Sequence, residues 1–168
     1  MKYFLLLVLI LPAFSFWAQN PKWKTLTQKS VALRYKIPKG WYVGGYQSPK
    51  RCKCTGASLN TAFDGSVNML IFASDTYGTD SLARQTIWGN EFDAELVQFS
   101  DSLHSDTNHF LKEFSTWKNN KKEFVLKYSS YTTKNAYIFY FWGSKEALLK
   151  KERLIDQIMQ SVKPITNG

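Results

Sequence analysis

Alternating apolar and polar residues predict β-strands along much of the chain. Residues 31–37 place an apolar side chain at every second position, which is the period of a strand with one buried face. Residues 66–74 are apolar almost throughout, as expected for a buried central strand. A short apolar segment at 41–43 predicts one more strand, and residues 94–99 fit either a strand or a helix.

The second half of the chain predicts a meander of three strands. These strands span residues 110–118, 122–132 and 136–142, and the residues between them, Asn119-Asn120 and Lys134-Asn135, favour turns. Residues 136–142 carry aromatic side chains on both faces. We therefore expect this last strand to lie in the core, covered on both sides.

Two helices complete the pattern. Asp80 is a suitable N-cap for a helix over residues 81–90. A second helix is predicted from about Lys145 or Leu149 to Val162, with Pro164 just beyond its end. Its inner side follows helical spacing and consists of Leu148, Leu149, Ile155, Ile158, Met159 and Val162.

The N-terminal segment has the layout of a secretory signal peptide. Lys2 precedes an apolar run at residues 3–11, Pro12 ends that run, and small residues follow it. The run is shorter than the roughly 20 apolar residues that span a bilayer. No later run approaches that length, so we expect no integral membrane segment in the mature chain.

We predict cleavage of the signal peptide after Ala18, with cleavage after Ser15 and an uncleaved anchor as the alternatives. Residues 1–18 are then the signal peptide, and residues 19–168 form a single domain. The mature protein is expected to be exported, either to the periplasm or out of the cell.

The charge is strongly positive, with a formal value of +9 at pH 7. Such a surface attracts anionic partners, including phosphate groups, lipid headgroups and acidic proteins. Export argues against nucleic acid as the partner, and a basic surface that only keeps the protein soluble is the alternative. The candidate contact surface consists of Lys50, Arg51, Lys53, Lys118, Lys121 and Lys122.

Cys52 and Cys54 are the two cysteines of the chain, and export favours a disulfide between them. In a regular strand their Cα atoms would lie about 6.5–7 Å apart, whereas a disulfide prefers about 5.5–6 Å. A bridge therefore needs a bent backbone. The alternatives are a redox-active or soft-metal site, in which basic neighbours would lower the thiol pKa, and unpaired or intermolecular thiols.

Candidate metal ligands and catalytic motifs are few. His104, Asp106 and His109 could bind a divalent ion, but the many Ser, Asp and Asn residues of this stretch favour an exposed loop. No nucleophile elbow, phosphate-binding loop or zinc-protease motif is present. We expect no catalytic residues and no cofactor.

The segment around Pro38, Gly40 and Trp41 resembles the opening strand and Ile-Pro-x-Gly-Trp turn of the PsbP-like superfamily. Residues 155–163 are similar to that family's closing helix, with Val162 in place of Phe. The superfamily includes extrinsic photosystem II proteins, Ran-binding transport factors and small exported bacterial proteins. The resemblance implies an α+β fold in which helices sandwich an antiparallel β-sheet.

The same resemblance implies a binding protein without catalytic residues. We therefore expect an exported binding or accessory domain that contacts a protein or another envelope component. A thiol-redox or soft-metal-handling protein that uses Cys52 and Cys54 is the alternative, and a hydrolase is the least favoured hypothesis. Independently of the family, Trp41 has the area to close one end of a sheet as a core residue, and Gly40 suits a turn.

Overall fold

The structure is a computed structural model. It describes residues 21–45, 52–76, 78–86, 88–90, 99–104, 107–117, 120–131 and 135–165. The predicted signal peptide lies outside the described residues, as do residues 94–98 of the segment that was assigned to either a strand or a helix.

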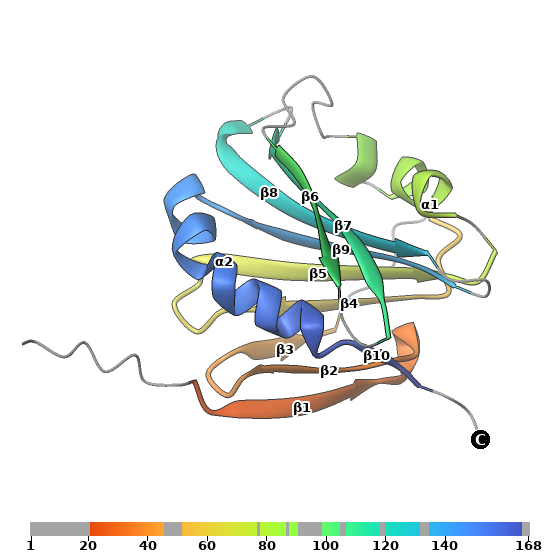
Figure 1. Cartoon of the computed structure of the whole chain (residues 1–168), viewed down its shortest axis with the longest axis horizontal. Helices are drawn as coiled ribbons and strands as arrows, with labels where there is room; N and C mark the ends of the chain where they lie inside the picture. The colour runs from red at the N-terminus through yellow and green to blue at the C-terminus, as the bar shows by residue number, and fades with distance from the viewer. Residues whose placement is uncertain are drawn as a thin grey trace, which may run out of the picture.

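The described residues form two antiparallel sheets (Figure 1). The larger sheet has seven strands in the order β3-β4-β5-β9-β8-β7-β6, and the smaller has three in the order β1-β2-β10. The larger sheet contains β3 (Tyr42–Gly44), β4 (Gly56–Thr61), β5 (Val67–Ser74), β6 (Phe99–His104), β7 (His109–Trp117), β8 (Asn120–Tyr131) and β9 (Ala136–Gly143). The smaller contains β1 (Trp23–Gln28), β2 (Leu33–Pro38) and β10 (Lys163–Pro164).

Two helices cover opposite faces of the seven-stranded sheet. On one face, Met69 and Ile71 of β5 pack in a core with Ile155 of α2 (Lys145–Gln160) and with the β1–β2 hairpin. On the other face, Leu70 of β5 packs in a second core with Leu82 of α1 (Thr79–Gln85). The predicted α+β fold, an antiparallel sheet sandwiched by helices, is thus confirmed.

Strand β9 contributes to both cores. Tyr137, Phe139 and Phe141 lie on the α2 side, and Ile138 and Tyr140 lie on the α1 side. All five side chains are at most 2% exposed, as the aromatic run predicts. Strand β9 lies between β5 and β8, and a helix covers each face of the sheet. These five side chains are therefore enclosed by protein, which favours apolar and aromatic residues.

Four strands were not predicted, namely β1, β4, β6 and the two-residue β10. Strand β4 reads as polar, yet its Ser58 and Asn60 are buried. The amide of Asn60 donates a hydrogen bond to the hydroxyl of Tyr35 at 3.0 Å, which partly compensates the burial. The sequence favoured an exposed loop for the polar stretch that includes β6; its side chains at Asp101, Ser102 and His104 are exposed, but they lie on a strand that pairs with β7 along its whole length.

The first predicted strand begins later than expected. Residues Lys29–Val31 form a short 3-10 turn, and Ala32 has a φ of 52° before β2 starts at Leu33. The predictions at 41–43, 66–74 and in the C-terminal meander agree with β3, β5, β7, β8 and β9 to within two residues at each end.

Both helices differ from prediction in detail. Gly78, rather than Asp80, is the N-cap of α1, and Asp80 lies in the first turn. Helix α1 ends at Gln85, because Thr86 adopts an extended conformation before the 3-10 turn η2 (Trp88–Asn90). In α2 the expected inner residue Leu149 is exposed, since it lies about 100° around the helix from the buried Leu148. No helix among the described residues is long and apolar enough to span a membrane.

Candidate functional site

The outer edge of the larger sheet carries an exposed apolar patch. Strand β3 ends this sheet, and among the described strands it pairs with β4 alone. Tyr42 and Val43 on β3 are 61% and 43% exposed, and Phe63 in the β4–β5 turn is 72% exposed. The rings of Tyr42 and Phe63 stack with their centroids 6.1 Å apart. We call these three residues, Tyr42, Val43 and Phe63, the edge patch.

Local turns hold the edge patch in place. Trp41 is 4% exposed and anchors the start of β3 in the α2-side core. In the β4–β5 turn the amide of Gly65, at a φ of 66°, donates to the carbonyl of Ala62 at 2.9 Å. The two aromatic rings are therefore presented to solvent on a hydrogen-bonded backbone.

Gly40 lies in a turn, as predicted, and it also leaves space for a neighbouring side chain. It lies in the turn between β2 and β3, but Gly65 is the glycine with a positive φ among the described residues. A Cβ atom at position 40 would lie 3.3 Å from the Cβ of Phe63, which is a tight contact. Gly40 therefore makes room for Phe63. Pro38 ends β2 and pairs with Trp23.

Three lysines lie near the chain segment that leads into the edge patch. The Lys24 ammonium donates a hydrogen bond to the carbonyl oxygen of Trp41 at 2.6 Å, and Trp41 is the residue that precedes Tyr42. The amide of Lys39 donates to the carbonyl of Lys22 at 2.7 Å, so these two exposed lysines are neighbours. No carboxylate in the described part of the chain forms an ion pair with Lys22, Lys24 or Lys39.

Asp64, which follows Phe63, does not cancel this charge. Its carboxylate accepts a hydrogen bond from Lys151 at 2.7 Å. That bond, together with one from Ser66, lowers the pKa of Asp64 well below its usual range. Asp64 is therefore ionised but already paired, which leaves the surroundings of the edge patch positively charged.

The basic surface predicted from the sequence is described only in part. The structure does not describe Lys50, Arg51 and Lys118. Strand β8 includes Lys121 and Lys122, but their side chains are not described. Lys53 is exposed, and its backbone amide donates to the side chain of Gln85 at 3.4 Å. A contact surface in this region stays a prediction.

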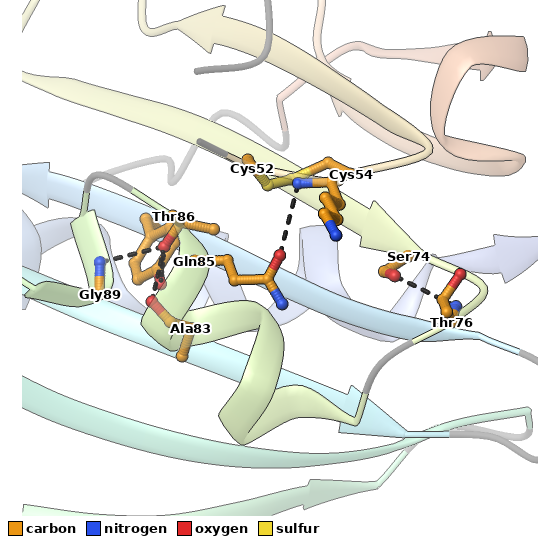
Figure 2. Close-up of a disulfide and its surroundings, with 10 residues drawn as sticks. Cys52, Cys54, Ser74, Thr76, Ala83, Gln85, Thr86 and Gly89 are labelled. Atoms are coloured by element: carbon orange, nitrogen blue, oxygen red, sulfur yellow. Dashed lines mark hydrogen bonds between the residues drawn. A yellow bond between two sulfur atoms is a disulfide. The ribbon is translucent and has the colours of Figure 1, made fainter. Parts of the chain in front are cut away.

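The structure joins Cys52 and Cys54 by a disulfide, next to α1 (Figure 2). Their Cα atoms lie 5.1 Å apart, so the backbone is bent more sharply than in a regular strand. Cys52 is buried in the α1-side core with Leu70 and Leu82, and Cys54 packs at its margin. Figure 2 shows Gln85 of α1 reaching the backbone between the two cysteines.

The candidate metal ligands His104 and His109 lie together. They form the last residue pair of the β6–β7 hairpin, and their imidazole centroids are 4.6 Å apart. Asp106 lies outside the described residues. Among the described residues no group of three or more His, Cys, Asp or Glu side chains is placed to hold a metal ion.

Two shallow clefts adjoin α2. One, of about 330 Å³, is lined by Pro21, Trp23, Lys36, Gln157, Gln160 and Ser161. The other, of about 440 Å³, lies between α2 and the β4–β5 turn and is lined mainly by serine, lysine and acidic side chains. Among the described residues, no histidine or cysteine lines either cleft.

Sequence reasoning missed the edge patch and its lysines. The Asp64-Gly65-Ser66 segment is a turn signal directly after Phe63. An aromatic residue at such a turn could have been marked as exposed. Nothing local indicates that β3 is an edge strand, because that property depends on the order of all the strands in the sheet.

Comparison with solved structures shows which proteins share this fold. No protein-family model matches the sequence, and no curated protein sequence is detectably similar to it. The structure is similar to cyanobacterial PsbP (CyanoP) from Synechocystis sp. PCC 6803, with a TM-score of 0.60 and 8% identity over 88% of this chain and 95% of that one. The fold is that of the PsbP-like proteins.

Two further solved structures share this fold. The Saccharomyces cerevisiae Ran-binding protein Mog1p matches with a TM-score of 0.50 and 8% identity, over 87% of this chain and 97% of that one. A Bacteroides thetaiotaomicron protein matches with a TM-score of 0.57 and 10% identity, over 86% of this chain but 49% of that one. At these identities the likeness concerns the fold alone, so activity and partners must be argued from this chain's own surface.

Proposed function

We propose that this chain is an exported, non-catalytic binding domain that docks a protein partner of the cell envelope through the edge patch. The N-terminal apolar run supports export to the periplasm or beyond. The single observation that carries the proposal is the stacked, exposed pair of Tyr42 and Phe63 on an edge strand. Exposed aromatic residues of this kind are typical anchors of protein interfaces.

The edge strand supports a particular mode of docking. A terminal strand has unpaired backbone N–H and C=O groups along its outer side, and an extended segment of a partner can add to it as a further strand. The exposed side chains of Tyr42 and Val43 would then contact that segment. The fold is compatible with such a role, since Mog1p, which shares it, is a Ran-binding protein.

The lysines near the patch favour a partner with negative charge. Lys22, Lys24 and Lys39 lie near the segment that leads into the patch, and none of them has an ion-pair partner among the described residues. A partner with acidic residues next to an apolar segment would meet complementary charge. Because these lysines lie at or near the surface, we expect the interaction to weaken as salt rises through the physiological range.

Affinity capture from the envelope fraction tests the proposal with a matched pair of variants. The patch variant is Tyr42→Ser with Phe63→Ser, and the control is Tyr131→Ser, which removes an aromatic side chain that is 67% exposed at the other end of the sheet. We expect one protein to be retained by the wild type and the control, and lost from the patch variant.

The same capture can contradict the proposal in two ways. If the patch variant retains every protein that the wild type retains, the edge patch is not the docking surface. If nothing is retained at low or at moderate salt, the binding role itself is wrong. Lys39→Glu adds a charge test, because it should reduce capture most strongly at low salt.

A thiol-redox role is the second candidate function, because the bond between Cys52 and Cys54 is one that such a role would reduce and re-form. In such a role, two glutathione thiols would reduce the disulfide to two cysteine thiols and leave oxidised glutathione. Thiol counting after equilibration with graded glutathione mixtures measures this directly. A disulfide that stays oxidised even at the most reducing ratio would reject the role.

A further inference from the structure

The two histidines of the chain come together on an exposed surface that the proposed function does not use. His104 on β6 is paired in register with His109 on β7, so both side chains leave the same face of the hairpin. The next pair along, Leu103 with Phe110, points the other way and packs in or against the α2-side core. Both imidazoles are exposed, so an ion from solvent could reach them.

A serine lies beside the Nε2 atom of His104. The Ser102 hydroxyl is 3.3 Å from Nε2 and can either accept a hydrogen bond from it or donate one to it. A proton on Nε2 leaves the lone pair of Nδ1 free for a ligand. Nδ1 of His104 faces Nδ1 of His109 across the strand pair.

The hairpin tip is held in place beside this pair. The side chains of Thr107 and Asn108 donate hydrogen bonds to the carbonyl oxygen of Val162, at 3.3 and 3.1 Å. Val162 follows α2, so these bonds tie the tip of the hairpin to the end of the helix. The two imidazoles therefore project from an anchored backbone, which reduces the entropy lost when both bind one ligand.

We propose that His104 and His109 bind one divalent late first-row transition-metal ion, of which Zn²⁺ is the test case, each through Nδ1. Imidazole is a preferred ligand of such ions, and water would complete the coordination. Two nitrogens bound to one tetrahedral Zn²⁺ at about 2.0–2.1 Å lie about 3.3 Å apart. The two Nδ1 atoms are 2.5 Å apart, so small rotations of two exposed rings suffice.

Binding also requires a defined proton arrangement. A hydrogen bond between the two Nδ1 atoms requires a proton on one of them. When the ion binds, that proton moves to Nε2 of the same ring or leaves to solvent, so both imidazoles bind as neutral ligands. The site lies on β6 and β7, at the sheet edge opposite to β3, and it is independent of the edge patch.

Zn²⁺ titration of the full, oxidised chain, produced without a histidine tag, tests the proposal. Long-range ¹H–¹⁵N NMR resolves the two imidazoles, because the chain contains two histidines. We expect both imidazoles to shift together, to saturate at one ion per chain and to end as Nε2–H tautomers. His104→Ala and His109→Ala should each weaken binding at least tenfold, whereas Leu111→Ala, an exposed neighbour on β7, should not.

Three results would overturn the proposal. They are a shift of only one imidazole, an affinity for Zn²⁺ that either histidine variant leaves unchanged, and binding that is lost in Cys52→Ser with Cys54→Ser but retained in the histidine variants. Circular dichroism of each variant checks that the fold is intact. Because all of the substituted β-hairpin side chains are exposed, we expect unchanged spectra.

Discussion

Lys112 links β7 to α2 through a network of partly buried charges. Its side chain is 7% exposed, and its ammonium donates to Glu152 at 2.6 Å and to Asp156 at 3.0 Å. Tyr128 also donates to Asp156, at 2.6 Å. Burial alone would lower the pKa of Lys112, but the bonds to the two carboxylates outweigh it and raise that pKa above 10.5.

Tyr128 has a raised pKa for a related reason. Burial, and then the hydrogen bond to the negative Asp156, raises its pKa above the usual 10.0. The folded protein therefore holds this proton, and the Lys112 proton, more tightly than the unfolded chain does. The stability that these groups contribute is present below about pH 10 and falls as pH rises above that value.

We predict that Tyr128→Phe lowers the free energy of unfolding by about 2 kcal/mol at pH 7, because a hydrogen bond to the Asp156 carboxylate is lost. The difference from the wild type should shrink near pH 11, where the wild type alone loses the Tyr128 contribution. Urea unfolding at both pH values measures this. Tyr131→Phe, at an exposed position, is the control; a gap of constant size would contradict the assignment.

A second residue-scale prediction concerns Gly56. A Cβ atom there would lie 1.4 Å from the carbonyl oxygen of Ser30, so the backbone at the start of β4 or in the 3-10 turn must move. We expect Gly56→Ala to lower stability by about 3 kcal/mol. Gly78→Ala is the matched control, because nothing lies within 4 Å of a Cβ atom at position 78. Similar urea midpoints for the two variants would refute this account.

At the scale of elements, long apolar patterns predicted helices and strands reliably, whereas short polar strands were missed. Helix α2 and strands β5 and β9 were predicted because their apolar residues repeat over several turns or positions. Strand β4 was missed because Ser58 and Asn60 occupy its buried positions, and only the neighbouring Tyr35 makes Asn60 tolerable there. Partners that are distant in sequence cannot be inferred from the local pattern.

Helix α2 provides the element-scale prediction. The Ser144 hydroxyl accepts a hydrogen bond from the amide of Ala147 at 3.2 Å and caps the helix. Ser144→Ala should lower the free energy of unfolding by about 1 kcal/mol, whereas Ser144→Asp should retain the cap. Chemical denaturation of the two variants checks this, and equal losses would show that the hydroxyl does not act as a cap.

At the scale of the whole molecule, β10 joins the two ends of the described chain. Lys163 and Pro164 pair with Arg34 and Leu33 of β2, and the amide of Ile165 donates to the carbonyl of Ala32 at 2.8 Å. The segment after α2 thus completes the sheet that the first strands begin. This closure connects the N-terminal hairpin to the helix that covers the main sheet.

Truncation tests that closure. A chain that ends at Val162 should unfold with a free energy about 2 kcal/mol lower than the full chain, since several backbone hydrogen bonds to β2 are lost. A chain that ends at Ile165 retains β10 and should match the full chain. If the two truncated chains show the same urea midpoint, β10 contributes nothing to stability.

The candidate sites could be predicted only in part, because their geometry depends on how distant parts of the chain are arranged in the fold. The cysteine pair and the two histidines were visible as residue types at short spacing. Their geometry was not, because it depends on the bend at residues 52–54 and on the register of β6 with β7. The edge patch was invisible, since Tyr42 resembles any strand residue until the order of the strands is known.

Strand β9 has a consequence for the unfolded chain. Its residues 136–142 contain no charge and no proline, and they strongly favour extended structure. Such segments assemble into steric zippers when they are solvent-exposed in many copies at once. The native fold covers β9, but the unfolded chain exposes it, so we expect this segment to promote self-association and the refolding yield to fall as protein concentration rises.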